Sequence, residues 1–68
     1  MGLPDPEGAY ARAQLAYAIR REIITRGLSQ REAALITRVK QPQISDITRG
    51  RLTGFSIDLL TTILNRFD

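Results

Sequence analysis

Residues 29–50 read SQREAALITRVKQPQISDITRG and decide the fold, because two helix patterns and a tight connection follow one another in this stretch. Ser29 is followed three residues later by Glu32, which is the capping-box pattern found at helix starts. The small and apolar residues that follow favour helix. This pattern predicts a helix over about 30–37.

A connection of four residues, 37–40, separates this helix from a second one, which is predicted over 41–49. Pro42 lies in the first turn of the second helix, where a missing N–H does no harm. Gly50 follows its end, where glycine readily adopts the left-handed conformation. Two short helices joined by so short a turn have helix-turn-helix geometry.

The second of these helices has an apolar face and a polar face. Ile44 and Ile47 lie three residues apart and form the apolar stripe that packs on the other helices. The polar side chains predicted to contact DNA bases are Gln41, Gln43, Ser45 and Arg49. Glutamine can bond to adenine with both amide atoms, and arginine can bond to guanine in the same way. The face therefore suits double-stranded DNA, with Gln41 and Gln43 as its readers, because they lie at the end that makes most base contacts.

Two further helices are predicted around this unit. One begins between residues 6 and 9 and ends at Arg26, and another follows Ser56, which is a good N-cap. Residues 1–8 are expected to be a flexible arm, because Pro4 and Pro6 interrupt regular structure. Residues 9–68 are predicted to be one all-α domain, a compact bundle of four to five short helices.

The apolar positions divide into a core and a candidate interface. The expected core consists of Leu15, Ile19, Ile23, Ala33, Ala34, Val39, Ile44 and Ile47. Leu35 and Ile36 are adjacent and cannot both face this core, so one of them is expected at the surface. The last helix carries more apolar surface than one small domain needs, which predicts a two-fold dimer interface formed by Leu59, Ile63, Leu64 and Phe67.

The composition limits the chemistry that the chain can perform. A chain of 68 residues is one domain and buries only about 60% of its unfolded surface, so its core is marginal. It has no Cys and no His, which excludes disulfides and thiolate metal sites and removes the usual general base. No catalytic residue, metal or cofactor is therefore expected, an enzyme is disfavoured, and a partner chain is the remaining way to stabilise the fold.

The net charge of +3 is concentrated in the middle of the chain. Residues 28–53 contain five basic and two acidic side chains, whereas residues 54–68 carry a net charge of −1. This distribution suits a polyanion, although an ordinary solvated basic surface gives the same pattern. No apolar run approaches the roughly 20 residues that span a bilayer, and no signal peptide is recognisable, so a cytoplasmic location is expected.

The motifs together resemble the Xre/Cro-repressor family, through LSQxEAA at 28–34 and VxQPxISDxxRG at 39–50. LTGFSIDxL at 52–60 is similar to the branch of HigA-type antitoxin regulators, and the resemblance extends over residues 12–66. It implies a repressor-like fold, with Gln30 near the backbone phosphates and the four polar residues of the second helix against DNA. Family members usually bind palindromic operators as homodimers, often repress their own promoter, and in this branch can have a toxin as partner.

Two residues of the turn depart from the family pattern. Arg38 replaces the usual Gly at a position that favours positive φ, at a cost of about 1 kcal/mol. Lys40 replaces the usual Ser or Thr N-cap, which costs about 1 kcal/mol as well. Either the two cations increase phosphate affinity or the turn has drifted neutrally. The predicted phosphate contacts are Gln30, Arg38, Lys40 and Arg51.

Alternatives to sequence-specific DNA binding remain at this point. The chain could be a protein-interaction module that neutralises a partner such as a toxin. Single-stranded nucleic acid is a weaker alternative, because its binding needs aromatic side chains in a basic groove, and the aromatic residues lie outside the basic segment. Arg49 could pair with Asp46, three residues before it, and be oriented by that carboxylate instead of contacting DNA freely.

Overall fold

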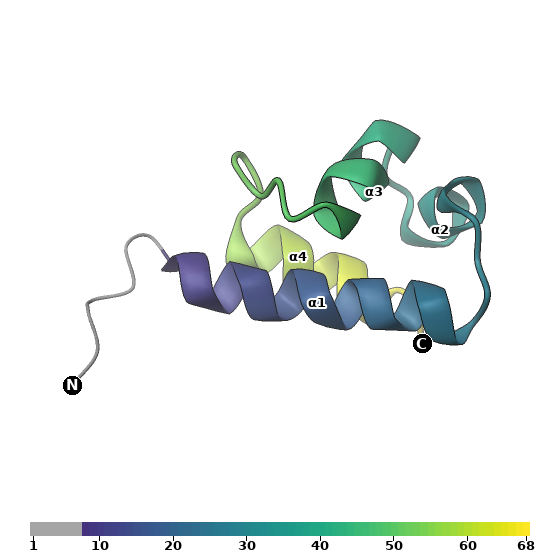
Figure 1. The fold of residues 1–68 in the computed structure, drawn as a ribbon, viewed down its shortest axis with the longest axis horizontal. Coiled ribbons are helices and arrows are strands. Elements are labelled where there is room, and N and C mark those ends of the chain that lie inside the picture. The colour runs from purple at the N-terminus through teal and green to yellow at the C-terminus, as the bar shows by residue number, and fades with distance from the viewer. Residues whose placement is uncertain (1–7) are drawn as a thin grey trace.

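The computed structural model describes residues 8–68, and these form four helices (Figure 1). The helices are α1 (Ala9–Thr25), α2 (Gln30–Thr37), α3 (Gln41–Thr48) and α4 (Ile57–Asn65). No strand occurs in this part of the chain, so the predicted all-α bundle of short helices is confirmed. Apart from Gly8, the arm expected at residues 1–8 lies outside the described residues.

The long helix α1 is the base on which the other helices are arranged. It packs against α4 and against α3, while α2 packs against α3. In Figure 1, α1 and α4 run alongside one another, α2 and α3 lie over them, and the C-terminus comes to rest beside the end of α1. No helix in residues 8–68 is long and apolar enough to cross a membrane.

The helix starts at α2 and α4 follow from their local sequence. The Ser29 hydroxyl oxygen accepts a hydrogen bond from the Glu32 backbone N–H at 3.1 Å, and a Glu32 carboxylate oxygen accepts from the Ser29 N–H at 2.8 Å. The predicted capping box is therefore confirmed. The Ser56 hydroxyl likewise accepts from the Leu59 N–H at 3.0 Å, which confirms the predicted cap of α4.

The core is formed by residues from all four helices and from the segments directly before and after α4. Its buried members are Ala16, Ile19, Ile23, Ala33, Ile44, Ile47, Phe55, Leu60, Ile63 and Phe67. Of the other residues predicted for the core, Leu15, Ala34 and Val39 are half-buried and pack against this cluster. The core thus extends further into the C-terminal part of the chain than the hydrophobic pattern predicted.

The surface of α4 differs from the interface that its sequence predicted. Ile63 is 0% exposed and Phe67 is 2% exposed, so both belong to the core of the chain itself. Because their surface is already covered, they cannot also cover a partner unless the chain opens. Leu59 and Leu64 are half-buried and are the two residues of the predicted interface that keep accessible surface.

Helix α2 presents apolar side chains to solvent at two adjacent positions. Leu35 is 73% exposed and Ile36 is 37% exposed, so both lie at the surface, although only one was expected there. The side of α2 that faces the core is occupied by Ala33 and Thr37, which are fully buried and lie four residues apart. The 3.6-residue repeat alone did not predict Thr37, because a polar residue takes an apolar position.

Candidate nucleic-acid interface

Helices α2 and α3 form a two-helix unit whose connection has three residues, 38–40. The apolar face of α3 is fixed to the rest of the domain, because Ile44 and Ile47 are buried in the common core. Burial of two isoleucine side chains stabilises this placement by roughly 3–6 kcal/mol before entropic costs are counted. The opposite face of α3 is therefore held outward on a rigid support.

The outward face carries the side chains that the sequence singled out for base contacts. Gln41 and Arg49 are exposed, while Gln43 and Ser45 are half-buried. Gln41 is the first residue of α3, whereas Arg49 is its C-cap, so the helix ends one residue earlier than predicted. All four residues therefore come from one helix and its end.

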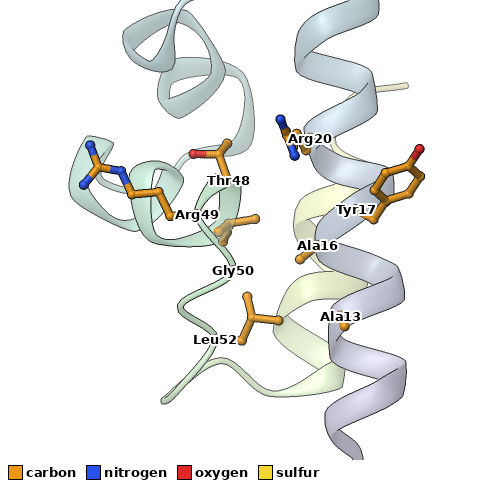
Figure 2. Close-up of a pocket in the computed structure, with 9 residues that line it drawn as sticks. Ala13, Ala16, Tyr17, Arg20, Thr48, Arg49, Gly50 and Leu52 are labelled. Atoms are coloured by element: carbon orange, nitrogen blue, oxygen red, sulfur yellow. The ribbon is translucent and has the colours of Figure 1, made fainter.

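Asp46 and Arg49 do not form the ion pair that their spacing allowed. Within residues 8–68, the ion pair present joins Arg26 to Glu22 in α1. In Figure 2 the Arg49 side chain extends away from α1 and past the outer side of α3. Its guanidinium group is therefore free to bind an external group.

The amide of Gln43 is partly engaged within the domain. Its side-chain oxygen accepts a hydrogen bond from the Lys40 backbone N–H at 3.0 Å, which is one half of a capping box. The other half is absent, since a lysine ammonium group cannot accept a hydrogen bond. A contact to adenine through both amide atoms would compete with this bond, whereas the Gln41 amide makes no hydrogen bond within residues 8–68.

The turn between α2 and α3 places an arginine in a backbone conformation that favours glycine. Arg38 has φ 62° and ψ 31°, and it is the non-glycine residue with positive φ among the described residues. Lys40 is the extended N-cap of α3 and provides no side-chain cap. Both predicted departures are therefore real features of the turn, and each costs on the order of 1 kcal/mol.

A tertiary hydrogen bond that the sequence did not predict reaches this turn. The Arg66 side chain, from the end of α4, donates to the Thr37 carbonyl oxygen at 2.6 Å. The two residues are 29 positions apart, so no local pattern connects them. A basic residue directly after the last apolar helix was the available signal, but its target could not be identified without the fold.

Comparison with known proteins agrees with this geometry. A family described as helix-turn-helix domain matches the chain over residues 1–68. The chain belongs to this helix-turn-helix domain family. No curated protein and no solved structure matches the chain. The family supports DNA as the partner of this helix-turn-helix domain.

The cations suited to DNA phosphates lie in the segments directly before and after α3. Arg38 and Lys40 lie in the turn, and Arg51 lies just after α3; all three side chains are exposed and have no ion-pair partner within residues 8–68. Gln30 is half-buried in the first turn of α2, where backbone N–H groups favour an anion. The three cations lie at both ends of α3.

A shallow hollow of about 260 Å³ lies between α1 and the end of α3 (Figure 2). It is lined by Ala13, Ala16, Tyr17, Arg20, Ile47, Thr48, Arg49, Gly50 and Leu52. A second hollow of about 420 Å³ lies on the outer face of α1 and shares Tyr17 and Arg20 with the first. Neither hollow is lined by a carboxylate, and no group of three or more potential metal ligands occurs in the described part of the chain.

Proposed function

We propose that this helix-turn-helix domain is a transcriptional regulator that reads double-stranded DNA by inserting α3 into the major groove. The observation that carries the proposal is the division of α3 into a buried isoleucine face and an outward polar face. Gln41, at the start of α3, is exposed and its amide makes no hydrogen bond within residues 8–68, while Ile44 and Ile47 fix the helix on α1 and α2. Such an arrangement suits base readout, because specificity needs a reader held in a fixed orientation.

Within the proposal the polar residues have different roles. Gln41 is the main base reader, and Gln43 contributes through its amide N–H groups while its oxygen caps α3. Ser45 and Arg49 would contact DNA further along the major groove. The cations Arg38, Lys40 and Arg51, together with Gln30, contact backbone phosphates; these contacts position the domain and do not read sequence.

The domain would act as a homodimer on a palindromic operator, as the Xre-type resemblance implies. Two recognition helices about 34 Å apart would enter successive major grooves on one side of the duplex. Leu59 and Leu64 remain available for the contact between protomers, whereas Ile63 and Phe67 are covered in the core. A mass measured by sedimentation at tens of micromolar should be twice 7.6 kDa, and a monomer would contradict this part of the proposal.

Selection of duplexes from a random library tests the proposed function directly. The wild-type chain should enrich one palindromic sequence, and affinity for it should fall steeply with salt. A dimer that neutralises about six phosphates with its three cations per protomer should give a log–log slope of about −5. Failure to enrich any sequence at low salt would contradict DNA readout.

A protein-interaction module is the second candidate function. It is favoured by the exposed apolar side chains of α1 and α2, which include Tyr17, Ile24 and Leu35. Exposed apolar surface of this kind marks protein contacts when its members are contiguous. In this reading the chain binds a partner such as a toxin, and an autoregulatory antitoxin would combine both functions. The duplex selection separates the two candidates, because a pure interaction module enriches no sequence.

A further inference from the structure

The end of α2 is fixed by contacts on both sides of Thr37. The Thr37 side chain is 0% exposed, and its hydroxyl donates to the Ala33 carbonyl oxygen at 2.7 Å. Its backbone carbonyl accepts from Arg66 at 2.6 Å, in a partly buried bond. The last four carbonyl groups of a helix lack partners within the helix. Arg66 therefore supplies from outside the partner that α2 cannot provide itself.

The electrostatics of this contact favour a cation. The carbonyl end of a helix carries partial negative charge, which a basic side chain compensates. Hydrogen bonds with an ionised donor are about twice as strong as neutral ones. Arg66 forms no ion pair within residues 8–68, so no carboxylate competes for its guanidinium group.

Arg66 is itself held in place by the packing of its neighbours. It is the C-cap of α4, and its backbone N–H bonds to the Ile63 and Thr62 carbonyl oxygens. The next residue, Phe67, is buried, and the Arg26 guanidinium at the end of α1 lies 5.6 Å from its ring centroid. The ends of α1, α2 and α4 therefore meet at one place, consistent with the position of the C-terminus in Figure 1.

The turn that follows Thr37 has little local support. Arg38 holds a left-handed conformation that favours glycine, and Lys40 begins α3 without a side-chain cap. The Arg66 bond acts on Thr37, the residue directly before Arg38. It thus opposes displacement of the turn at the point where its own sequence stabilises it least.

We infer that Arg66 is a positioning residue for DNA recognition, which holds the turn and thereby sets the orientation of α3 relative to α2. The inference rests on the proposed function, since orientation of α3 affects affinity only if α3 binds DNA. Arg66 acts through the Thr37 carbonyl and does not contact DNA.

Three variants test the inference. Arg66→Met keeps side-chain length and removes the donor, Arg66→Lys keeps a cationic donor, and Ile19→Val weakens the core away from the turn. Amide hydrogen exchange in the free protein reports on the turn through the N–H groups of Arg38, Gln43 and Ile44, which bond within or beside it. Arg66→Met should speed their exchange by about tenfold, as expected for loss of a charged hydrogen bond. Ile19→Val should speed exchange throughout the domain without singling out these three.

Binding supplies the second measurement, with the duplex recovered by selection on the wild-type chain. Corrected for the folded fraction, Arg66→Met should bind about tenfold more weakly at every salt concentration with an unchanged salt slope. Arg66→Lys should recover most of the affinity, and Ile19→Val should bind as the wild type does. Because the dimer carries two copies of Arg66, a slope reduced by about two would mean a direct phosphate contact and would overturn the positioning role.

Amide hydrogen exchange distinguishes failure of the Arg66 inference from failure of the proposed DNA binding. If Arg66→Met leaves the exchange of the three amides no faster than Ile19→Val does, Arg66 does not hold the turn and the inference is wrong. If exchange responds but affinity of the folded protein does not change, the contact is structural only, which also overturns the inference. A wild-type chain that enriches no duplex would remove the proposed function, while exchange would still decide whether Arg66 supports the turn.

Discussion

The starts of α2 and α3 differ in how their unpaired backbone N–H groups are satisfied. At α2, Ser29 and Glu32 bond to each other's backbone N–H groups, so two of the unpaired donors are satisfied locally. At α3, Gln43 bonds back to the Lys40 N–H, but Lys40 offers no acceptor in return. The start of α2 therefore has a complete capping box, whereas the start of α3 has only one of the two capping hydrogen bonds.

The difference teaches where the stability of α3 originates. An eight-residue helix is marginal in isolation and depends on packing. For α3 that support comes from burial of Ile44 and Ile47 and from the Arg66 bond to the preceding turn. The two residues that weaken the turn, Arg38 and Lys40, are both exposed cations that precede α3.

The largest expected effect concerns the packing that holds α3. Ile47→Ala should lower the free energy of unfolding by about 2–5 kcal/mol, because it leaves a cavity beneath the helix. Leu35→Ala is the matched control, since Leu35 is exposed, and it should change stability by about 0.5 kcal/mol or less. Urea unfolding followed by circular dichroism measures both. Equal effects of the two variants would contradict the account of how α3 is held.

The complete cap of α2 provides the second test. Ser29→Ala should cost about 1 kcal/mol of stability, because the Glu32 N–H loses its acceptor. Glu32→Gln keeps an oxygen that can accept from the Ser29 N–H, so it should cost appreciably less. Thermal unfolding under identical conditions distinguishes the two. A loss for Glu32→Gln as large as that for Ser29→Ala would mean that charge, and not the box, stabilises the helix start.

A substitution in the strained turn should raise the stability of the domain, in contrast to the two substitutions above. Arg38→Gly should stabilise the domain by about 0.5–1 kcal/mol, since glycine adopts φ 62° without steric cost but loses more entropy on folding. The same change should weaken binding of the selected duplex, because a cation is removed. Stability and affinity measured on one preparation should therefore change with opposite signs. A destabilised variant would show that the arginine side chain contributes packing at this position.

The smallest effect on stability is expected at the incomplete cap. Lys40→Ala should change the free energy of unfolding by less than about 0.5 kcal/mol, because the lysine side chain makes no capping bond. Its effect on DNA should instead appear in the salt titration, as a slope shallower by about two, because the dimer carries two copies of Lys40. A stability loss as large as that of Ser29→Ala would remove the contrast between the two helix starts.

These contrasts also show which features the sequence could predict. The Ser29 and Ser56 caps depend on neighbouring residues, and the local sequence predicted them, whereas the positive φ at Arg38 was implied by the Xre-type resemblance. The Arg66 bond to Thr37 joins residues 29 positions apart and depends on how α4 ends beside α2. Such a contact requires the tertiary arrangement, which local patterns do not contain.

The candidate interface was predictable in outline for the same reason. Helical periodicity placed Arg49 outward because Ile44 and Ile47 had to face inward, whereas Gln41 was predicted as a reader because it lies at the N-terminal end of the helix. Periodicity could not show that the Gln43 oxygen bonds to the Lys40 N–H, since this depends on a rotamer. On α4, broad apolar character could not separate core from surface, and so it included two residues, Ile63 and Phe67, that the fold buries.

Base readout by the outward face of α3 is tested most directly at Gln41. The measurement compares wild type and Gln41→Ala on the selected duplex and on duplexes changed at each single position. Wild type should discriminate by about tenfold or more at the position that Gln41 reads. Gln41→Ala should lose discrimination at that position and keep it elsewhere. An unchanged profile, or equal weakening on every duplex, would contradict base readout by this residue.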